Sequence, residues 1–392
     1  MTAVYLNAMG ALCALGRGAA IAQSLFADHP RGVCASDLYT PGRPLHLGCI
    51  ADPLPDLSHA PIRQRSRSNA LLCAALSELM PAVQTALQRF GPARIAVVVG
   101  VSTAGLQEGE RAAREHHAGA GWPQGYDYAQ QEMGNAAAFV ARESGCRGPQ
   151  YAISTACSSG AKALASGARL LRAGLVDAVI AGGGDALSGF TIAGFNALES
   201  VSEKRCNPLS INRSGINIGE AAALFLMSRE PGPVRVAGWG ETSDAYHMSA
   251  PDPSGRGAID AMRRALHRAG IGPNTIDYVN LHGTATPHND AMESLAVAEV
   301  LGGETPVSST KPLTGHALAA AGAIEAAIAW HTLVGNPQGR LPAHWWDGEC
   351  DPALARLHVV APGEALGRPV RHVLSNSFAF GGNNATLVFA SE

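Results

Sequence analysis

The feature that most constrains the fold is an alternation of short β-branched runs with longer stretches that carry helix patterns. Strand-like runs occupy residues 94–100, 151–155 and 177–185 in the first half of the chain, and residues 233–240, 276–284 and 372–377 in the second. Helix-like stretches lie between them at residues 158–174, 258–270 and 290–301. Strands that alternate with helices are typical of α/β layers. The sequence therefore predicts an α/β protein.

A faint internal repeat suggests that the chain is duplicated. Residues 160–168 read GAKALASGA and residues 315–323 read GHALAAAGA, and each segment follows a strand end that contains a Ser-Thr pair. Small residues are common in this chain, which has 45 glycines, so chance could supply part of the match. We expect two halves, residues 1–230 and 231–392, whose small residues allow tight turns and close helix packing.

Composition and charge exclude several classes of protein. With 46% hydrophobic and 16% charged residues, the chain is expected to have a large core. Its net charge of −3 gives no reason to expect nucleic acid. The eight cysteines form no C-x-x-C pair, and a disulfide framework is usual only in much smaller secreted chains. The first residues lack the basic region of a signal peptide, and the most apolar run, residues 317–330, is too short to span a bilayer. We expect a cytoplasmic protein without a membrane span.

Cys157 is the one cysteine placed where a strand, a turn and a helix follow one another. It lies in the segment STACSSG, at or just before the start of a helix-like stretch. The positive end of the helix dipole is expected to lower the pKa of such a thiol and to raise its thiolate fraction. A buried structural cysteine is an equal alternative from these residues alone. The segment gives a candidate nucleophile.

A second segment, LHGTATPHNDAME, carries His282 at the end of a strand-like run, where α/β proteins usually place their sites. Asp290 and Glu293 follow three residues apart at the start of a helix, where either could act as a cap. A satisfied core histidine is the alternative for His282, and a surface position is favoured for His288.

Two further segments combine polar or aromatic residues with small ones. In SSTKPLTGHALAAAGAIEA, Lys311 and His316 stand near the start of a small-residue helix, and the apolar flanks do not suit an ordinary solvated lysine. In SNSFAFGGNN, Phe378 and Phe380 alternate before two glycines, which would let the backbone approach a ligand closely. A hairpin turn with two packed aromatic side chains is the alternative. The 14 histidines show no H-E-x-x-H or similar spacing, so no metal site is expected.

In this order, the four segments resemble the β-ketoacyl-acyl carrier protein synthases of types I and II, and the similarity extends over almost the whole chain. The resemblance implies a thiolase-like fold, in which two duplicated halves give five α-β-α-β-α layers, usually as a dimer. It implies an acyltransferase that condenses an acyl group with malonyl-acyl carrier protein, by decarboxylation, to give 3-oxoacyl-acyl carrier protein. No bound cofactor is implied, because the phosphopantetheine arm arrives on the carrier protein.

Matched residue by residue, the resemblance makes Cys157 the acyl-accepting nucleophile, and makes His282 and His316 the pair that acts on the malonyl unit. Lys311 matches the active-site lysine of the family. Glu293 matches a structural acid of the site.

The resemblance also implies roles for residues around this centre. Phe380 matches a gating phenylalanine whose backbone N–H joins that of the nucleophile in an oxyanion hole, and Phe378 matches a second aromatic residue nearby. Arg63, Arg65 and Arg67 match the basic region that docks the acidic carrier protein. A solvated basic face is the alternative, since alternate spacing does not put all three side chains on one helical face.

Departures from the family pattern bear on the pathway. Ala379 stands where the family usually has a flexible glycine, and residues 208–223 keep only part of the family's pattern. These changes favour a specialised ketosynthase of polyketide or aryl polyene biosynthesis over primary fatty-acid synthesis. In several such systems the active subunit pairs with a related subunit that lacks the cysteine, so we expect either a homodimer or such a heterodimer.

The alternative function is a non-catalytic chain-length partner or acyl-binding subunit, against which the intact cysteine and both histidines argue. A non-decarboxylating thiolase is disfavoured, because no second cysteine stands near the C-terminus.

Overall fold

Strands of the N-terminal half form one side of a mixed sheet in a computed structural model, which describes residues 2–392. From the edge inward they are β6 (Gln150–Ile153), β5 (Ile95–Gly100), β7 (Ala178–Asp185), β8 (Ala221–Ser228) and β1 (Tyr5–Cys13). β6, β5 and β7 are parallel, and β8 is antiparallel to both β7 and β1. β5, β7 and β8 are buried along their whole length, as expected for strands that are covered on both faces.

The C-terminal half repeats this strand order. Its strands are β11 (Pro306–Ser308), β10 (Tyr278–Asn280), β13 (His372–Ala379), β14 (Asn383–Ser391) and β9 (Val234–Ser243), with the short β12 (His358–Val359) beyond β11. If the five main strands of each half are numbered by their order along the chain, both halves have the sheet order third, second, fourth, fifth, first. This shared order confirms the predicted α/β class and the duplication. The division at residue 230 stays a prediction, and residues 229–233 connect β8 to β9.

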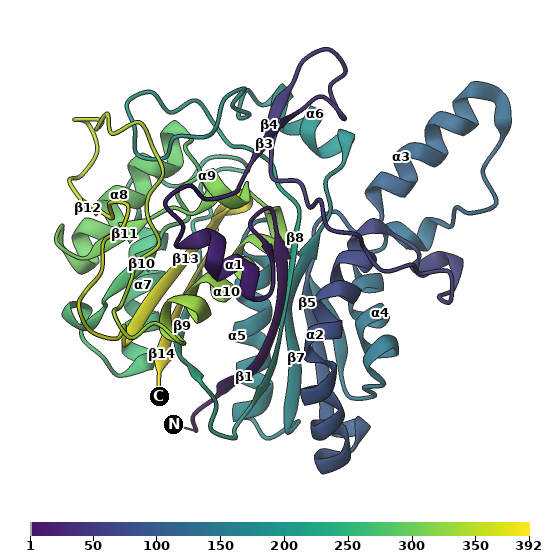
Figure 1. Cartoon of the computed structure of the whole chain (residues 1–392), viewed down its shortest axis with the longest axis horizontal. Coiled ribbons are helices and arrows are strands. Elements are labelled where there is room, and N and C mark those ends of the chain that lie inside the picture. Colours follow the sequence, from purple (N-terminus) through teal and green to yellow (C-terminus); the bar gives the residue numbers. More distant parts are fainter. Residues whose placement is uncertain (1) are drawn as a thin grey trace.

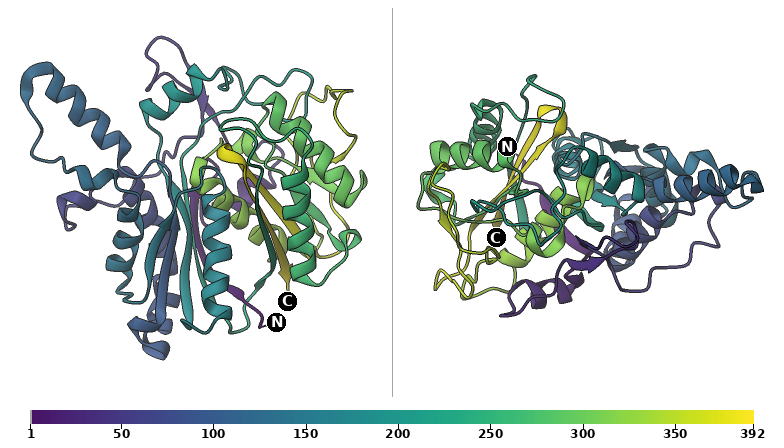
Figure 2. Two further views of the ribbon diagram at one scale, coloured as in Figure 1. Left: turned by 180° about the vertical axis from the view of Figure 1, so that it is seen from behind. Right: turned by 90° about the horizontal axis from the view of Figure 1, so that it is seen from above.

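Six helices and the two halves of the sheet form five layers. α2 (Arg67–Phe90) and α4 (Gly134–Ser144) cover the outer face of the N-terminal strands, and α7 (Arg256–Ala269) and α8 (Pro287–Leu301) flank the C-terminal strands on the opposite side (Figures 1 and 2). α5 (Ser159–Arg172) and α10 (Ala321–Leu333) lie together between the two sets of strands. The order of layers is α-β-α-β-α.

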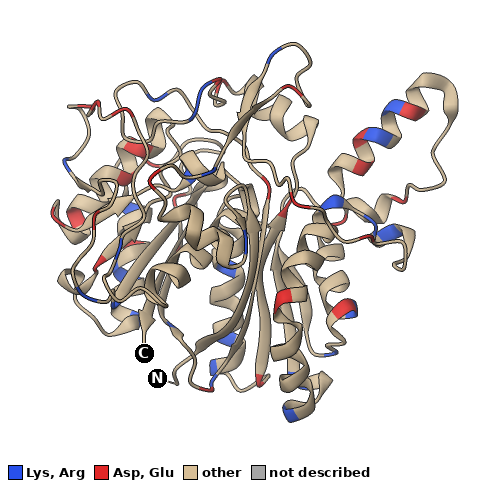
Figure 3. Ribbon diagram, in the orientation of Figure 1, with Lys and Arg blue, Asp and Glu red and all other residues tan. Residues whose placement is uncertain are grey.

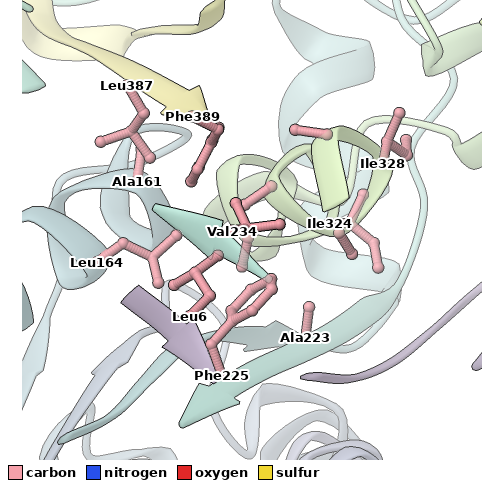
Figure 4. Packing of buried hydrophobic residues seen from close by; sticks show 14 of the residues in the cluster. Leu6, Ala161, Leu164, Ala223, Phe225, Val234, Ile324, Ile328, Leu387 and Phe389 are labelled. Carbon is pink, nitrogen blue, oxygen red and sulfur yellow. The ribbon is translucent and has the colours of Figure 1, made fainter. Parts of the chain in front are cut away.

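The two halves share one core and one strand pairing. Tyr5 of β1 pairs with Arg235 of β9, which makes the sheet continuous. Apolar side chains of both halves meet between the layers (Figure 4), among them Leu6, Ala161, Leu164, Phe225, Val234, Ile324 and Phe389. Because these side chains come from both ends of the chain, neither half could bury its inner face alone.

Glycines set the distance between the two central helices. A Cβ atom on Gly160 would lie 2.8 Å from the carbonyl oxygen of Ala319 and 2.8 Å from the backbone nitrogen of Ala323. A Cβ atom on Gly322 would lie 2.8 Å from the backbone nitrogen of Ala161. These separations are too short for any side chain, so the small residues are what allows α5 and α10 to approach.

α2 is the one helix of residues 2–392 that is long and apolar enough, by length and composition, to cross a membrane. Half of its apolar window is buried inside the protein, and the helix packs on β1, β7 and β8. This is the packing of a core helix.

Shorter elements surround the layers. They are α1 (Ala19–Leu25), β2 (Gly16–Arg17), β3 (Cys34–Ser36), β4 (Leu45–Leu47), α3 (Leu106–Glu115), α6 (Gly189–Ala197) and α9 (Lys311–Thr314). α3 and the residues up to 131 project from the body as an arm (Figures 1 and 2), with charged residues of both signs along α3 (Figure 3). Within the arm the Trp122 ring stacks on His116 and Tyr126, at centroid distances of 4.4 and 5.3 Å.

Candidate active site

Cys157 lies in a tight turn between β6 and α5. Ala156 has a φ of +51°, which is a strained backbone conformation for a residue with a side chain. The Ser159 hydroxyl holds the turn, because it accepts a hydrogen bond from the Thr155 N–H (2.8 Å) and donates one to the Ala156 carbonyl (2.6 Å). The strand, turn and helix predicted around Cys157 are therefore present, and the turn fixes the position of the thiol.

Two imidazoles from the C-terminal half face this thiol. His282 follows β10, and His316 follows α9. The Sγ atom of Cys157 and one nitrogen of each ring all lie within 4.8 Å of one another. The two rings are nearly perpendicular, at 85°, with centroids 5.3 Å apart. The structure thus brings together three residues from segments that are far apart in the sequence.

The tautomer of each imidazole follows from its Nδ1 partner. The Lys311 ammonium lies 3.4 Å from Nδ1 of His282, and the Leu318 N–H donates to Nδ1 of His316 (3.3 Å). Since both partners are donors, each Nδ1 must accept, and the ring proton is on Nε2. Both rings therefore offer an Nε2–H donor to a ligand. A metal ion would need the Nε2 lone pairs instead, so the donor set of this cluster does not suit a metal.

Lys311 is held in the site by a buried carboxylate. Its Nζ atom lies 2.5 Å from Oε1 of Glu325 on α10, and both side chains are almost fully buried. Burial lowers the pKa of His282 well below its ordinary value, and Lys311 and then His316 lower it further. Burial and Lys311 likewise lower the pKa of His316. Both rings are neutral at neutral pH.

The prediction of a lowered thiol pKa is wrong for the resting site. Burial raises the pKa of Cys157 to about 12, and the opposing effect of Lys311 is smaller. Only 6% of the residue is exposed, so the loss of hydration outweighs the helix dipole. The side chain of Cys157 is therefore a thiol at neutral pH.

Glu293 and Asp290 bind the loop that carries His282, and neither caps its helix. The Glu293 carboxylate accepts hydrogen bonds from the backbone N–H groups of His282 (2.8 Å) and Gly283 (2.7 Å). Asp290 accepts from the N–H groups of Ala285 (3.2 Å) and Leu209 (2.8 Å). Burial raises the pKa of Glu293 to about 7, although the two N–H groups oppose the shift. These carboxyl groups hold the loop in place.

A cavity of about 430 Å³ leads to the three residues. Cys157, His282 and His316 line it together with Phe378 and Phe380. The remaining lining includes Phe195, Leu198, Ile216, His288 and Ala379. Cys157 follows β6 and His282 follows β10, so the cavity lies at the carboxyl ends of parallel strands, where α/β proteins bind ligands.

The predicted gate lies at a hairpin. β13 and β14 pair as antiparallel strands around Phe380, and the Phe380 ring lies 5.6 Å from that of Phe195. Ala379 adopts an extended conformation that any residue tolerates, whereas Gly381 has a φ of +78°. The backbone therefore needs glycine after Phe380 and not before it.

Arg63, Arg65 and Arg67 are not equivalent. Arg67 is paired with the buried Glu220 (2.5 Å), and Arg65 donates to the carbonyl groups of Ala60 and Ser58. Arg63 is exposed. Of the three, Arg63 has the side chain that is freest to meet a partner.

Sequence reasoning missed Glu325. Glu325 is the one charged residue within the apolar run at residues 317–330. A single carboxylate in an otherwise apolar helix was the available signal, because buried carboxylates require a partner.

Comparisons with known proteins agree with this geometry. Two family models match, the β-ketoacyl synthase N-terminal domain over residues 46–231 and the β-ketoacyl synthase C-terminal domain over residues 234–335. A chain from the complex of a ketosynthase with its chain length factor, from Xenorhabdus doucetiae, superposes with a TM-score of 0.94. It is 44% identical, over 100% of this chain and 98% of that chain. A β-ketoacyl synthase from Burkholderia phymatum has a TM-score of 0.84 at 27% identity, over 100% of both chains.

The 3-oxoacyl-[acyl-carrier-protein] synthase 2 of Staphylococcus aureus is 37% identical in an alignment of 268 residues that covers 64% of this chain. That match spans 63% of the staphylococcal protein, less than two thirds of its length. Fold and site together define a protein of the thiolase-like ketosynthase class. The chain belongs to the β-ketoacyl synthase family.

Proposed function

We propose that this protein is an active 3-oxoacyl-acyl carrier protein synthase. The observation that carries the proposal is the meeting of the Cys157 thiol with two neutral imidazoles in one cavity. A non-catalytic chain-length partner would not need these three groups together. The names of the relatives above support the same activity.

In the loading step, the sulfur of Cys157 attacks the thioester carbonyl of an acyl-carrier protein. The new C–S bond forms, the carrier thiolate leaves, and the proton lost by Cys157 ends on the departing carrier thiol. The backbone N–H groups of Cys157 and Phe380 are proposed to stabilise the oxyanion of the tetrahedral intermediate. The N-terminus of α5 and Lys311 favour the developing thiolate.

In the condensation step, the thioester oxygen of malonyl-carrier protein accepts hydrogen bonds from the Nε2–H groups of His282 and His316. The bond between the α-carbon and the carboxylate breaks and carbon dioxide is released, and the electron pair of that bond forms an enolate that these two donors stabilise. The enolate carbon attacks the acyl carbonyl, a C–C bond forms, and the bond to Cys157 breaks. The thiolate of Cys157 then takes up a proton from solvent, and 3-oxoacyl-carrier protein leaves.

Neutral imidazoles suit the second step. A cationic ring would bind the malonyl carboxylate and so stabilise the group that must be lost, whereas a neutral Nε2–H favours the charge that develops on the thioester oxygen. The burial that lowers both histidine pKa values supports this assignment.

We also propose that the protein works in a specialised polyketide or polyene pathway in the cytoplasm, as a heterodimer with a related subunit that acts as a chain length factor. The ketosynthase complex from Xenorhabdus doucetiae supports this assembly. β6 forms one end of the sheet and has a strand neighbour on one side only within residues 2–392. The projecting arm exposes Trp122. An unpaired strand edge and an exposed aromatic side chain are both features that suit contact with a second subunit.

Intact-mass measurement with acyl-carrier protein tests the activity. The wild type should gain one acyl mass and release it as 3-oxoacyl-carrier protein when malonyl-carrier protein is added, whereas Cys157→Ala should not gain it. Cys146→Ala is the matched control, because Cys146 is also buried but lies outside the cavity. Absence of acylation across donors of different length, with and without a co-expressed chain-length subunit, would refute the enzymatic function.

A further inference from the structure

His344 is a buried histidine outside the cavity whose two ring nitrogens are both bound. It lies between α10 and β12 and is 1% exposed. Nε2 is 2.9 Å from the carbonyl oxygen of Pro208, and Nδ1 accepts the backbone N–H of Ser309 (3.0 Å). Because a carbonyl can only accept, the ring proton is on Nε2, and the lone pair of Nδ1 accepts the N–H of Ser309. A neutral imidazole therefore joins two loops by opposite kinds of hydrogen bond.

The loop that contains Ser309 connects His344 to Lys311. The Ser309 hydroxyl donates to the carbonyl of Gly283 (2.7 Å) and accepts the N–H of Lys311 (3.3 Å). Ser309 also packs tightly on Gly283, where a Cβ atom would lie 2.5 Å from that of Ser309. Any displacement of Ser309 therefore moves both Lys311 and the residue that follows His282.

The loop that contains Pro208 connects His344 to the other end of the segment that carries His282. Leu209, the residue after Pro208, donates its N–H to Asp290, and Asp290 also accepts the N–H of Ala285. Leu209 and Ala285 each have a φ of +63°, a left-handed conformation that costs free energy for a residue with a side chain. Such backbone persists only where neighbouring groups hold it.

We propose that His344 is a positioning residue for the decarboxylation and condensation step, and that it acts by holding Ser309 and so the separation between Lys311 and His282. The inference rests on the roles proposed above for Lys311 and His282. Lys311 lies 3.4 Å from Nδ1 of His282. A shift of this contact releases the Nε2–H tautomer that the enolate requires. Loading of Cys157 does not use this tautomer, and the attraction between the Lys311 charge and the thiolate changes only gradually with distance.

Two substitutions separate this role from a general effect on stability. His344→Asn places an amide oxygen where Nδ1 was and keeps the bond from Ser309, but loses the bond to Pro208. His344→Gln places an amide nitrogen where Nε2 was and keeps the bond to Pro208, but loses the acceptor for Ser309. Each variant loses one hydrogen bond, and asparagine leaves the larger space, so a purely structural role predicts a loss in His344→Asn at least as large as in His344→Gln.

The experiment measures acyl loading by intact mass, condensation with malonyl-carrier protein, and the melting temperature for the wild type and both variants. We expect His344→Gln to lose condensation rate by about 10- to 100-fold, the loss that follows small displacements of catalytic groups. His344→Asn should stay within about threefold of the wild type. Both should load acyl groups at close to the wild-type rate. Equal losses of condensation in the two variants, or a parallel loss of loading, would overturn the proposal.

A second variant covers the case in which substitutions of His344 do not fold. Ser309→Ala removes the hydroxyl that bridges Gly283 and Lys311, and it should slow condensation without slowing loading. Unchanged condensation in this variant would also overturn the proposal. A wild-type protein that neither loads nor condenses would instead refute the proposed function, so the two failures are distinguishable.

Discussion

The ion pair between Lys311 and Glu325 allows stability and activity to be tested separately. Lys311→Met leaves the Glu325 carboxylate buried without its counter-ion. The double variant Lys311→Met/Glu325→Leu removes both charges and fills the space with apolar side chains. Both side chains are at most 3% exposed, so solvent cannot take the place of the missing partner.

The expected loss follows from this burial. Removing one partner of a buried ion pair costs about 3–5 kcal/mol, whereas replacing both by apolar residues is close to neutral. With an unfolding entropy of about 2.1 cal/mol/K per residue, a chain of 392 residues loses about 4–6 °C in melting temperature for the single variant. The double variant should melt within about 1 °C of the wild type.

Calorimetry at one protein concentration and a condensation assay together test the reasoning. We expect the double variant to regain stability but not condensation, because Lys311 no longer donates to Nδ1 of His282. A double variant that is less stable than Lys311→Met would show that the pairing of charges is not what stabilises this site. Restored condensation in the double variant would show that Lys311 does not orient His282.

Three further outcomes are expected. At pH 8, iodoacetamide should alkylate Cys157 more slowly than the exposed Cys350 in peptide mass mapping, because burial raises the pKa of Cys157 to about 12; faster labelling would contradict a resting thiol. Burial lowers the pKa of His344 from 6.5 to about 4, so the folded protein binds fewer protons there than the unfolded chain does. This difference contributes about 3 kcal/mol to the free energy of unfolding, a contribution that is complete above pH 6.5 and lost as the pH falls to about 4. In denaturant titrations, the free energy of unfolding of His344→Gln should therefore fall less on acidification than that of the wild type. Arg63→Ala should raise the KM for carrier protein several-fold without changing the melting temperature. Arg67→Ala should lower the melting temperature, because it leaves the buried carboxylate of Glu220 without its partner. Equal melting temperatures for the two variants would contradict this difference.

Much of the fold could be predicted from local patterns. The strand-like run at residues 94–100 became β5, and the helix-like stretch at residues 258–270 became α7. The run at residues 276–284 forms a strand only over Tyr278–Asn280. The residues after it follow a different path, because Glu293 and Asp290 bind their backbone N–H groups and draw the loop toward α8. Both carboxylates stand in the same sequence segment as His282, but residue type alone does not show that they turn back to bind its backbone instead of capping α8.

The sequence by itself determined which residue types could perform the chemistry, since a cysteine at a strand–helix turn and histidines among small residues are visible in four short segments. Only the tertiary structure decided that Cys157 and the two histidines meet, and that Glu325 balances Lys311. It also decided that the thiol pKa of Cys157 rises, whereas the helix position had predicted a fall. The reason is physical: residue type and helix position are local properties, but hydration, the partner of a charge and the tautomer of an imidazole depend on the atoms that folding brings alongside.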